Sequence, residues 1–135
     1  MDMEFTKNPN NLDIDFMTQM INKEVEGYGL AHSFACFIRN ENHELVAGCN
    51  GSIIFGSIYT DQLWVDKQYR KRGLGKRLMN AVHEYGRNQG CKLATVATMS
   101  FQNARSFYER LGYRVDFERE GYINNACCLF LRKEL

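Results

Sequence analysis

The sequence predicts an α+β fold in which helices pack on a mixed β-sheet. Apolar side chains recur at helical spacing in three segments, over residues 11–26, 73–89 and 103–112. Between and after these segments the apolar period changes to two, which is typical of half-buried strands. The middle helix joins two strands over a length that suits a parallel crossover. The expected order is therefore helix, three antiparallel strands, helix, parallel strand, helix and two final strands.

The first helix is predicted within "LDIDFMTQMINKEVEG", where apolar residues recur from Leu12 to Val25 and glycines follow as stop signals. An antiparallel meander is predicted next. In "SFACFIR" the side chains of Phe34, Cys36 and Ile38 share one face, and the polar turn "NENHE" leads into "LVAGC" and "SIIFGSIYTDQLWV". These segments supply the three antiparallel strands.

The second half of the chain is predicted to alternate helices and strands. After the helix at 73–89 comes the short apolar strand "GCKLATVAT". In "NARSFYERLG" the side chains of Ala104, Phe107, Tyr108 and Leu111 share one face of a short helix. The chain closes as a hairpin of "YRVDFER" and "ACCLFLRKEL".

Length and composition narrow the class of protein. A chain of 135 residues fits one domain, residues 1–135, with a single core. The acidic, polar start argues against a secretory signal, and no apolar run approaches the roughly 18 residues of a membrane span. The five cysteines include no C-x-x-C pair, so we expect reduced thiols and no metal site. A cytoplasmic protein without membrane association is expected.

The stretch "KQYRKRGLGKRLM" has the wrong charge for the start of a helix. It carries six positive charges where the helix dipole is itself positive, and no Ser, Thr, Asp or Asn between 70 and 75 supplies a cap. Glycines at 73 and 75 leave the backbone accessible. Free N–H groups, a positive helix end and basic side chains together indicate a site for phosphates. Solvated surface charge is the alternative interpretation.

Other sites for polyanions fit this stretch less well. Arg70 stands where a Walker loop needs its first glycine, and Arg77 follows Lys76 where that loop needs Ser or Thr. A dinucleotide fingerprint needs a third glycine, and that position is Leu78. The basic patch is short, aromatic residues do not interleave with it, and the pI is near 7.6, so no nucleic-acid partner is expected.

Two motifs in this order resemble the GCN5-related N-acetyltransferase (GNAT) superfamily. Arg70, Gly73 and Gly75 match its R/Q-x-x-G-x-G/A signature. Further along the chain, "NARSFYERLGY" matches a second pattern through an asparagine, a tyrosine and a Gly-Tyr pair. The resemblance covers about residues 59–115. It implies a central mixed sheet of about six to seven strands with about three helices, and an acetyl-CoA-dependent N-acetyltransferase that lets an amine attack the thioester directly in a ternary complex.

The resemblance also implies which residues hold acetyl-CoA. Backbone amides from Arg70 to Lys76 would bind the pyrophosphate, and main-chain groups of "QLWV" would bind pantetheine. Asn103 matches a position that contacts the cofactor arm. The implied cofactor-binding residues are Leu63, Trp64, Val65, Arg70, Lys71, Arg72, Gly73, Leu74, Gly75, Lys76 and Asn103.

Two catalytic residues are expected. Tyr108 matches the family's usual acid for the departing thiol, whereas spacing alone favours a core aromatic on a short helix. No glutamate stands in "QLWV" as a base, and Asp61 is the nearest carboxylate. A β-bulge, common in that strand of the family, would change which face Asp61 shares with Leu63 and Val65.

Members of this superfamily usually carry a strand and two helices before the second strand, and the acceptor site is often built from that region. Only 30 residues are available here, so the acceptor is the least determined part. Residues 1–30 carry six acids and two bases, and Glu118 and Glu120 flank the last hairpin. They favour a cationic acceptor, either a small molecule or a peptide amine. His83 is expected to be solvated, and His32 either lines the acceptor pocket or is structural. A homodimer is left open. A non-catalytic module that binds acyl-CoA is the alternative function, and multiple-turnover release of CoA would distinguish the two.

Overall fold

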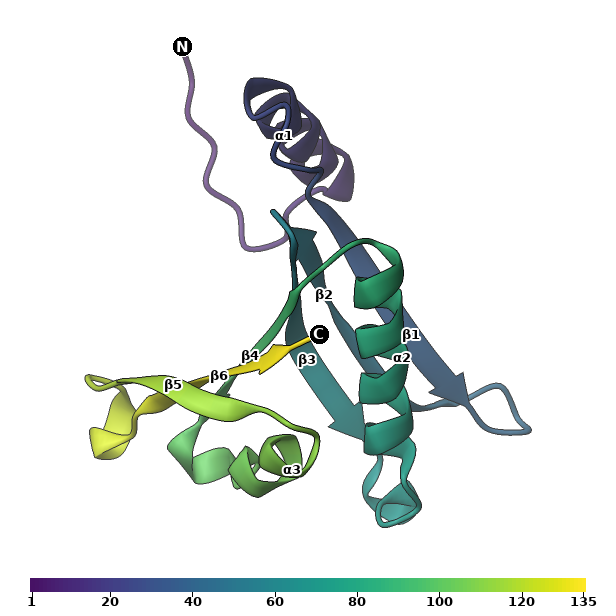
Figure 1. Cartoon of the computed structure of the whole chain (residues 1–135). Helices are drawn as coiled ribbons and strands as arrows, with labels where there is room; N and C mark the ends of the chain where they lie inside the picture. Colours follow the sequence, from purple (N-terminus) through teal and green to yellow (C-terminus); the bar gives the residue numbers. More distant parts are fainter.

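The computed structural model describes residues 1–135 as a six-stranded mixed sheet with three α-helices (Figure 1). The helices are α1 (Asn11–Glu24), α2 (Leu74–Asn88) and α3 (Arg105–Arg110). The strands are β1 (His32–Arg39), β2 (Leu45–Ile54), β3 (Ser57–Val65), β4 (Leu93–Met99), β5 (Arg114–Arg119) and β6 (Cys128–Glu134). The predicted α+β fold and the predicted order of its elements are confirmed.

The strands lie in the order β1-β2-β3-β4-β6-β5, and only β3 and β4 are parallel. Helix α2 forms the crossover between them and packs across β1, β2 and β3 (Figure 1). It approaches the sheet closely because Gly86 has no side chain: a Cβ there would lie 2.8 Å from a methyl carbon of Ile58. The final hairpin forms as predicted, and β6 rather than β5 pairs with β4.

The buried face of α2 differs from the predicted one. Its buried residues are Leu78, Met79, Val82, His83 and Gly86. His83, predicted to be solvated, is 4% exposed, and its Nε2 lies 2.8 Å from the hydroxyl oxygen of Tyr113. Packing against the segment around Tyr113 widens the buried side of the helix beyond the stripe that contacts the sheet. Burial lowers the pKa of His83 to about 4, so its imidazole is neutral at pH 7.

Strand β3 contains the bulge that the family resemblance suggested. Asn50 of β2 pairs with Gln62, whereas Gly51 pairs with Thr60, so Asp61 is an extra residue on β3. The backbone N–H of Gln62 donates to Oδ1 of Asn50 at 3.1 Å. A Cβ on Gly51 would collide with the carbonyl oxygen of Tyr59, so this position requires glycine.

The bulge changes which residues of β3 face the core. Before it, Ile58 and Thr60 are buried, and after it Leu63 and Val65 are the half-buried residues. Asp61 is exposed. An unbroken strand would have turned Leu63 and Val65 to the opposite face from Ile58.

Helix α1 confirms the first predicted helix and ends two residues earlier than expected. Its side chains include no buried residue. Asn22 donates to the carbonyl oxygen of Ala31 and accepts from its N–H, at 3.1 and 2.9 Å. This pair of hydrogen bonds joins the end of α1 to the start of β1, and Figure 1 shows α1 beyond the ends of β1 and β2.

No helix in the structure is both long enough and apolar enough to span a membrane. All five cysteines are free thiols, and Cys49, Cys91 and Cys128 are buried. Burial raises the pKa of the Cys49 thiol to about 11, which keeps it protonated.

Candidate active site

A groove of about 900 Å³ opens where β3 and β4 part. Their pairing ends at Thr60 and Val96, although β3 continues to Val65 and β4 to Met99. The start of α2 and helix α3 complete the walls. The groove brings together twelve of the residues named from the sequence, namely Asp61, Leu63, Trp64, Val65, Arg70, Lys71, Gly73, Leu74, Gly75, Lys76, Asn103 and Tyr108.

The loop before α2 presents unpaired backbone donors to this groove. Gly73 is the N-cap, has φ of 77° and makes no side-chain cap. The first hydrogen bond into this helix runs from the N–H of Arg77 to the carbonyl oxygen of Gly73. The amides of the first turn are therefore free to bind an anion. Lys71, at φ of 61°, adds a second left-handed residue to the loop, a pattern that forms concave sets of N–H groups.

The basic side chains of this loop have different orientations. The Nε–H of Arg70 donates to the carbonyl oxygen of Val65 at 3.0 Å. The guanidinium of Arg72 lies over the Tyr69 ring, 5.1 Å from its centroid, and Arg72 does not line the groove. Lys71 and Lys76 do line it. These two lysines are consequently the loop's cations best placed for phosphate oxygens.

Glycine is needed at the two signature positions for different structural reasons. Gly73 needs its left-handed conformation, and the space where a Cβ would stand is open. A Cβ on Gly75 would lie 3.2 Å from the Phe107 ring. Gly75 therefore lets α2 and α3 pack closely, in addition to the ligand access predicted for it from the sequence.

The end of β4 and the start of α3 form the far wall of the groove. Oε1 of Gln102 accepts from the backbone N–H of Met99 at 2.7 Å and from the hydroxyl of Thr98 at 3.1 Å. Asn103 follows with φ of 56°, a conformation that asparagine adopts more readily than most residues. These contacts turn the chain into α3 beside the groove.

Some residues that line the groove were not predicted from the sequence. Arg110 lines it from α3 and adds a cation, and Phe107 lies one turn earlier on the same helix. Their spacing of three residues, which places two side chains on one helix face, was the available signal. Gln102 carried no such signal, because its position depends on the turn that ends β4.

Tyr108 is both a core aromatic and a residue of the groove. It is 7% exposed, and its ring meets the rings of Phe107 and Tyr113 edge to face, with centroids 5.1 and 5.6 Å apart. Burial raises the pKa of Tyr108 to about 12, so the phenol stays protonated at neutral pH. It can therefore donate a hydrogen bond to a group that gains negative charge in the groove.

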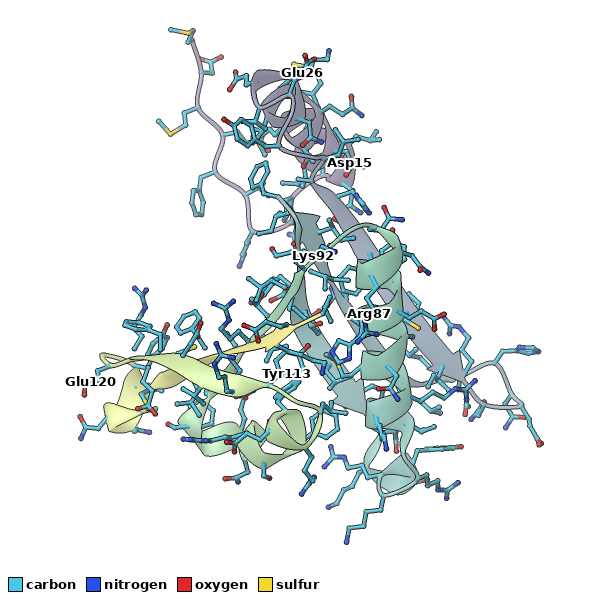
Figure 2. The ribbon with its side chains drawn as sticks, in the orientation of Figure 1. Asp15, Glu26, Arg87, Lys92, Tyr113 and Glu120 are labelled. Atoms are coloured by element: carbon cyan, nitrogen blue, oxygen red, sulfur yellow. The ribbon has the colours of Figure 1, made fainter.

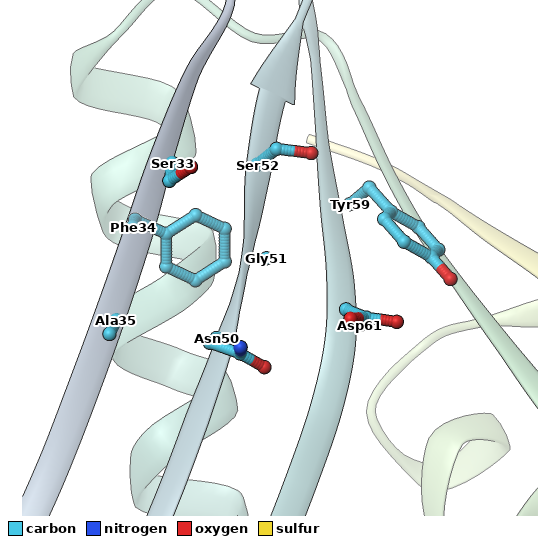
Figure 3. Close-up of a pocket in the computed structure, with 8 residues that line it drawn as sticks. All are labelled: Ser33, Phe34, Ala35, Asn50, Gly51, Ser52, Tyr59 and Asp61. Carbon is cyan, nitrogen blue, oxygen red and sulfur yellow. The ribbon is translucent and has the colours of Figure 1, made fainter. Parts of the chain in front are cut away.

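A second pocket of about 720 Å³ lies over β1, β2 and β3 (Figure 3). Its polar lining residues are Ser33, Asn50, Ser52, Tyr59 and Asp61. Figure 3 shows Asn50 and Ser52 on β2 facing the space beside Asp61 and Tyr59 of β3. Asp61 lines both the groove and this pocket and is the only acidic residue in either lining. Burial and the nearby Asp61 charge raise the pKa of Tyr59.

Thr60, the last residue of β3 that pairs with β4, has an unsatisfied side-chain hydroxyl. The hydroxyl oxygen of Thr60 is buried and has no hydrogen-bond partner. Such an unpaired group lowers stability by about 1–3 kcal/mol. It lies where β3 and β4 part, next to the bulge in sequence.

The acidic segments that favoured a cationic acceptor do not form one rim. Figure 2 shows Asp15 and Glu26 near α1, far from Glu120 at the β5–β6 end. Glu118 lies 3.9 Å from Arg105. Of the acidic residues considered from the sequence, only Asp61 lines the groove and the second pocket. No group of three or more His, Cys, Asp or Glu side chains is arranged to hold a metal ion.

A match to a known protein family identifies the family of this chain. Residues 5–113 match the model of the acetyltransferase (GNAT) family. The chain belongs to this family. A curated relative, blasticidin-S acetyltransferase of Streptomyces morookaense, is 35% identical over 103 residues, which cover 76% of this chain and 75% of the relative. This GNAT chain is an N-acetyltransferase, as the sequence predicted.

Solved structures agree with the GNAT fold. An acetyltransferase from Bacillus cereus superposes with a TM-score of 0.77 at 23% identity and covers 100% of both chains. A Bacillus anthracis acetyltransferase, solved in complex with acetyl coenzyme A, has a TM-score of 0.70 at 16% identity and covers 84% of this chain and 67% of its own. GNAT acetyltransferases use acetyl-CoA as the acetyl donor.

Proposed function

We propose that this GNAT enzyme transfers the acetyl group of acetyl-CoA to the primary amine of a small cationic molecule, by direct attack in a ternary complex. The observation that carries the proposal is the meeting of two pockets at Asp61. One is a groove with free helix amides and two lysines at its mouth, and the other is a polar pocket open to solvent. A donor in the first and an acceptor in the second would meet where β3 and β4 part.

The groove suits acetyl-CoA along its length. The amides of Gly73 to Lys76 would hold the pyrophosphate, with Lys71 and Lys76 beside it. Pantetheine would lie along Leu63 to Val65, whose backbone edge has no partner in β4. Main-chain donors of the same segment would polarise the thioester carbonyl. The remaining predicted residue, Arg72, would act only at the rim, because its guanidinium stacks on Tyr69.

The reaction forms a C–N bond and breaks a C–S bond. The lone pair of the neutral amine attacks the thioester carbon, the amine loses a proton, and CoA leaves as a thiolate that gains one. An amine with a pKa near 10.4 is almost wholly protonated at pH 7, so a proton must be removed before attack. Asp61 would attract the ammonium and orient a water that carries this proton away.

Tyr108 would assist the leaving thiolate. Its pKa of about 12 lies above that of a thiol near 8.5, so complete proton transfer to the thiolate is uphill by roughly 5 kcal/mol. A hydrogen bond from the phenol to the sulfur, strengthening as negative charge builds there, does not need that transfer. Tyr108, the predicted general acid, would thus assist mainly through this hydrogen bond, and the departing thiolate would take its proton from water.

The second pocket and the relative support a class of acceptor. Hydroxyl, amide and carboxylate groups line the pocket, and no basic residue is among them. The relative is named for its action on blasticidin-S. We therefore favour an amine-bearing antibiotic or a similar polar cation over a peptide lysine. The single domain over residues 1–135 and the cytoplasmic location stay predictions.

A panel of amines tests this function. The full chain is incubated with acetyl-CoA and blasticidin-S, an aminoglycoside, a polyamine or a lysine peptide. Thiol release and the mass of the acetylated product are then measured. We expect multiple turnovers with at least one polar cationic small molecule. No turnover with any amine would overturn the proposal, and a peptide or a neutral amino acid as the best substrate would overturn the acceptor class.

A further inference from the structure

Tyr108 stands on a helix that is too short to fix the direction of its hydroxyl by itself. Helix α3 has six residues, and Ala104 supplies no side-chain cap at its start. A helix of this length is not stable in water without contacts to other elements. Tyr108 is also the only buried residue of α3. The contacts of Tyr108 with the rest of the chain therefore decide where its hydroxyl points.

Tyr113 contacts Tyr108 in two ways. Its ring meets the Tyr108 ring at an angle of 68°, with the centroids 5.6 Å apart. Its backbone N–H donates to the carbonyl oxygen of Tyr108 at 3.1 Å. Both residues are buried, in a part of the core where side chains are closely packed. A shift of the Tyr113 ring would consequently move the surface against which Tyr108 packs.

The hydroxyl end of Tyr113 is joined to α2 through His83. The hydroxyl oxygen lies 2.8 Å from Nε2 of His83, and both side chains are buried. Burial lowers the pKa of His83 and raises the pKa of Tyr113, so at pH 7 this hydrogen bond joins a neutral imidazole to a neutral phenol. Apolar residues could fill the same space, but a hydrogen-bonded polar pair in the core favours one arrangement of its members.

We propose that His83 and Tyr113 are positioning residues of the acetyl transfer. The hydrogen bond between them fixes the Tyr113 ring, and that ring holds the hydroxyl of Tyr108 toward the sulfur of CoA. The inference rests on the role proposed above for Tyr108. Neither His83 nor Tyr113 lines the groove, so both act through Tyr108 and not on acetyl-CoA. A small displacement of the hydroxyl would weaken its bond to the sulfur in the transition state, which lowers turnover without lowering cofactor affinity.

Helix α2 would then align the cofactor with the group that assists its departure. The free amides of its first turn are those proposed to bind the pyrophosphate. Next to them, Gly75 lets the Phe107 ring of α3 pack on the helix. Two turns later, His83 contacts Tyr113, which in turn packs on Tyr108. One helix thus bears on both the phosphates and the phenol.

Steady-state kinetics of the full chain test this inference, with acetyl-CoA and the amine of the panel above that is turned over fastest. In Tyr113→Phe we expect kcat to fall about tenfold, with the KM for acetyl-CoA changed less than about twofold. Tyr85→Phe is the matched control. It also removes a hydroxyl that contacts a histidine, His32, at 2.9 Å, and it should keep full kcat. Near-full kcat in Tyr113→Phe would overturn the inference.

A double variant separates positioning from stability. Tyr113→Phe leaves the buried His83 without its partner, so the melting temperature should fall by about 5 °C. Combining it with His83→Leu removes both polar groups, and the melting temperature should rise again. The kcat should stay about tenfold low, because the hydrogen bond that fixes the ring is still missing. A kcat that recovers together with the melting temperature would show a role in stability alone and would overturn the inference.

A second pair of variants tests the route through Tyr108. Added to Tyr108→Phe, the change Tyr113→Phe should lower kcat by less than about twofold more, since the hydroxyl that it positions is already gone. A further loss of about tenfold in that background would show that Tyr113 acts elsewhere.

Crystal structures with bound CoA, which need no acceptor, distinguish failure of this inference from failure of the role of Tyr108. The Tyr108 hydroxyl should lie within hydrogen-bond reach of the CoA sulfur in the unmodified protein and away from it in Tyr113→Phe. The same position in both structures would overturn the inference and leave the role of Tyr108 standing. Near-full turnover in Tyr108→Phe alone would overturn that role, and the inference with it.

Discussion

Tyr108 shows how one side chain can belong to the core and line the groove. We predict that Tyr108→Phe lowers turnover roughly 10²- to 10⁴-fold, because the variant loses only the donor to the leaving sulfur. The affinity for CoA and the melting temperature should stay nearly unchanged, since the ring packing remains. Initial rates of thiol release measure turnover, and thermal melts with and without CoA measure stability and CoA binding.

Tyr85→Phe is the matched control for Tyr108→Phe. It removes a hydroxyl that contacts His32 at 2.9 Å, away from the groove. This control should keep full turnover. If Tyr108→Phe keeps near-full activity, or loses it only in step with its stability, Tyr108 is a packing residue.

Asp61 lies at the junction of the two pockets, and its role has a pH signature. Asp61→Asn should lower turnover more at pH 7 than at pH 9, because at pH 9 a larger share of the amine is already neutral. Initial rates at both pH values, under saturating acetyl-CoA, provide the comparison. Asp116→Asn, on β5 and outside both pockets, is the control. An equal loss at both pH values would remove Asp61 from proton transfer.

At the scale of elements, the bulge of β3 connects packing with chemistry. At the bulge, the side-chain oxygen of Asn50 accepts a hydrogen bond from the backbone N–H of Gln62. Gly51 has no side chain, which leaves space for the backbone of β3 at this point. Asn50→Ala removes the acceptor, so the bulge should loosen and Asp61 should lose its fixed position between the pockets. We expect a stability loss of about 1 kcal/mol and a fall in turnover of about tenfold or more, with little change in CoA affinity.

Two variants control for the loss of a polar group from the pocket. Ser52→Ala removes a hydroxyl from the same pocket without changing a bulge contact, and should change turnover little. Asn50→Asp keeps the acceptor oxygen and should retain more activity than Asn50→Ala. Equal losses in Ser52→Ala and Asn50→Ala would show that Asn50 acts only through the pocket surface.

At the scale of the whole molecule, the buried His83 links stability to pH. Its pKa is about 4 in the folded protein and near 6.5 in the unfolded chain. The unfolded state therefore binds the proton first as pH falls, so stability present above about pH 6.5 is lost toward pH 4. The loss from this group amounts to about 3 kcal/mol.

Urea denaturation between pH 6.5 and 5 measures this effect before most carboxylates titrate. In His83→Gln the slope of stability against pH should be flatter than in the unmodified protein, because no imidazole titrates. Replacement of His43, which lies in an exposed turn, should leave the slope unchanged. Identical slopes in His83→Gln and the unmodified protein would contradict the assignment.

The sequence by itself determined the features that depend on near neighbours. The spacing of apolar residues predicted three helices and six strands, because periodicity shows which face of each element is buried. It placed residues 52–54 in the third strand, whereas they end β2 and the turn follows at Phe55 and Gly56. The missing cap, the two glycines and the six charges predicted an anion-binding loop before α2, because capping and the helix dipole act within one turn.

The tertiary structure decided what depends on residues far apart in the chain. The parting of β3 and β4 at Thr60 and Val96, and the bulge that places Asp61 between two pockets, arise from pairing between strands. His83 is buried because a segment 30 residues later packs on α2. The guanidinium of Arg72 lies over the Tyr69 ring and does not line the groove. Local pattern does not encode these contacts, because side-chain orientation and strand register are set by the partners that each element meets on folding.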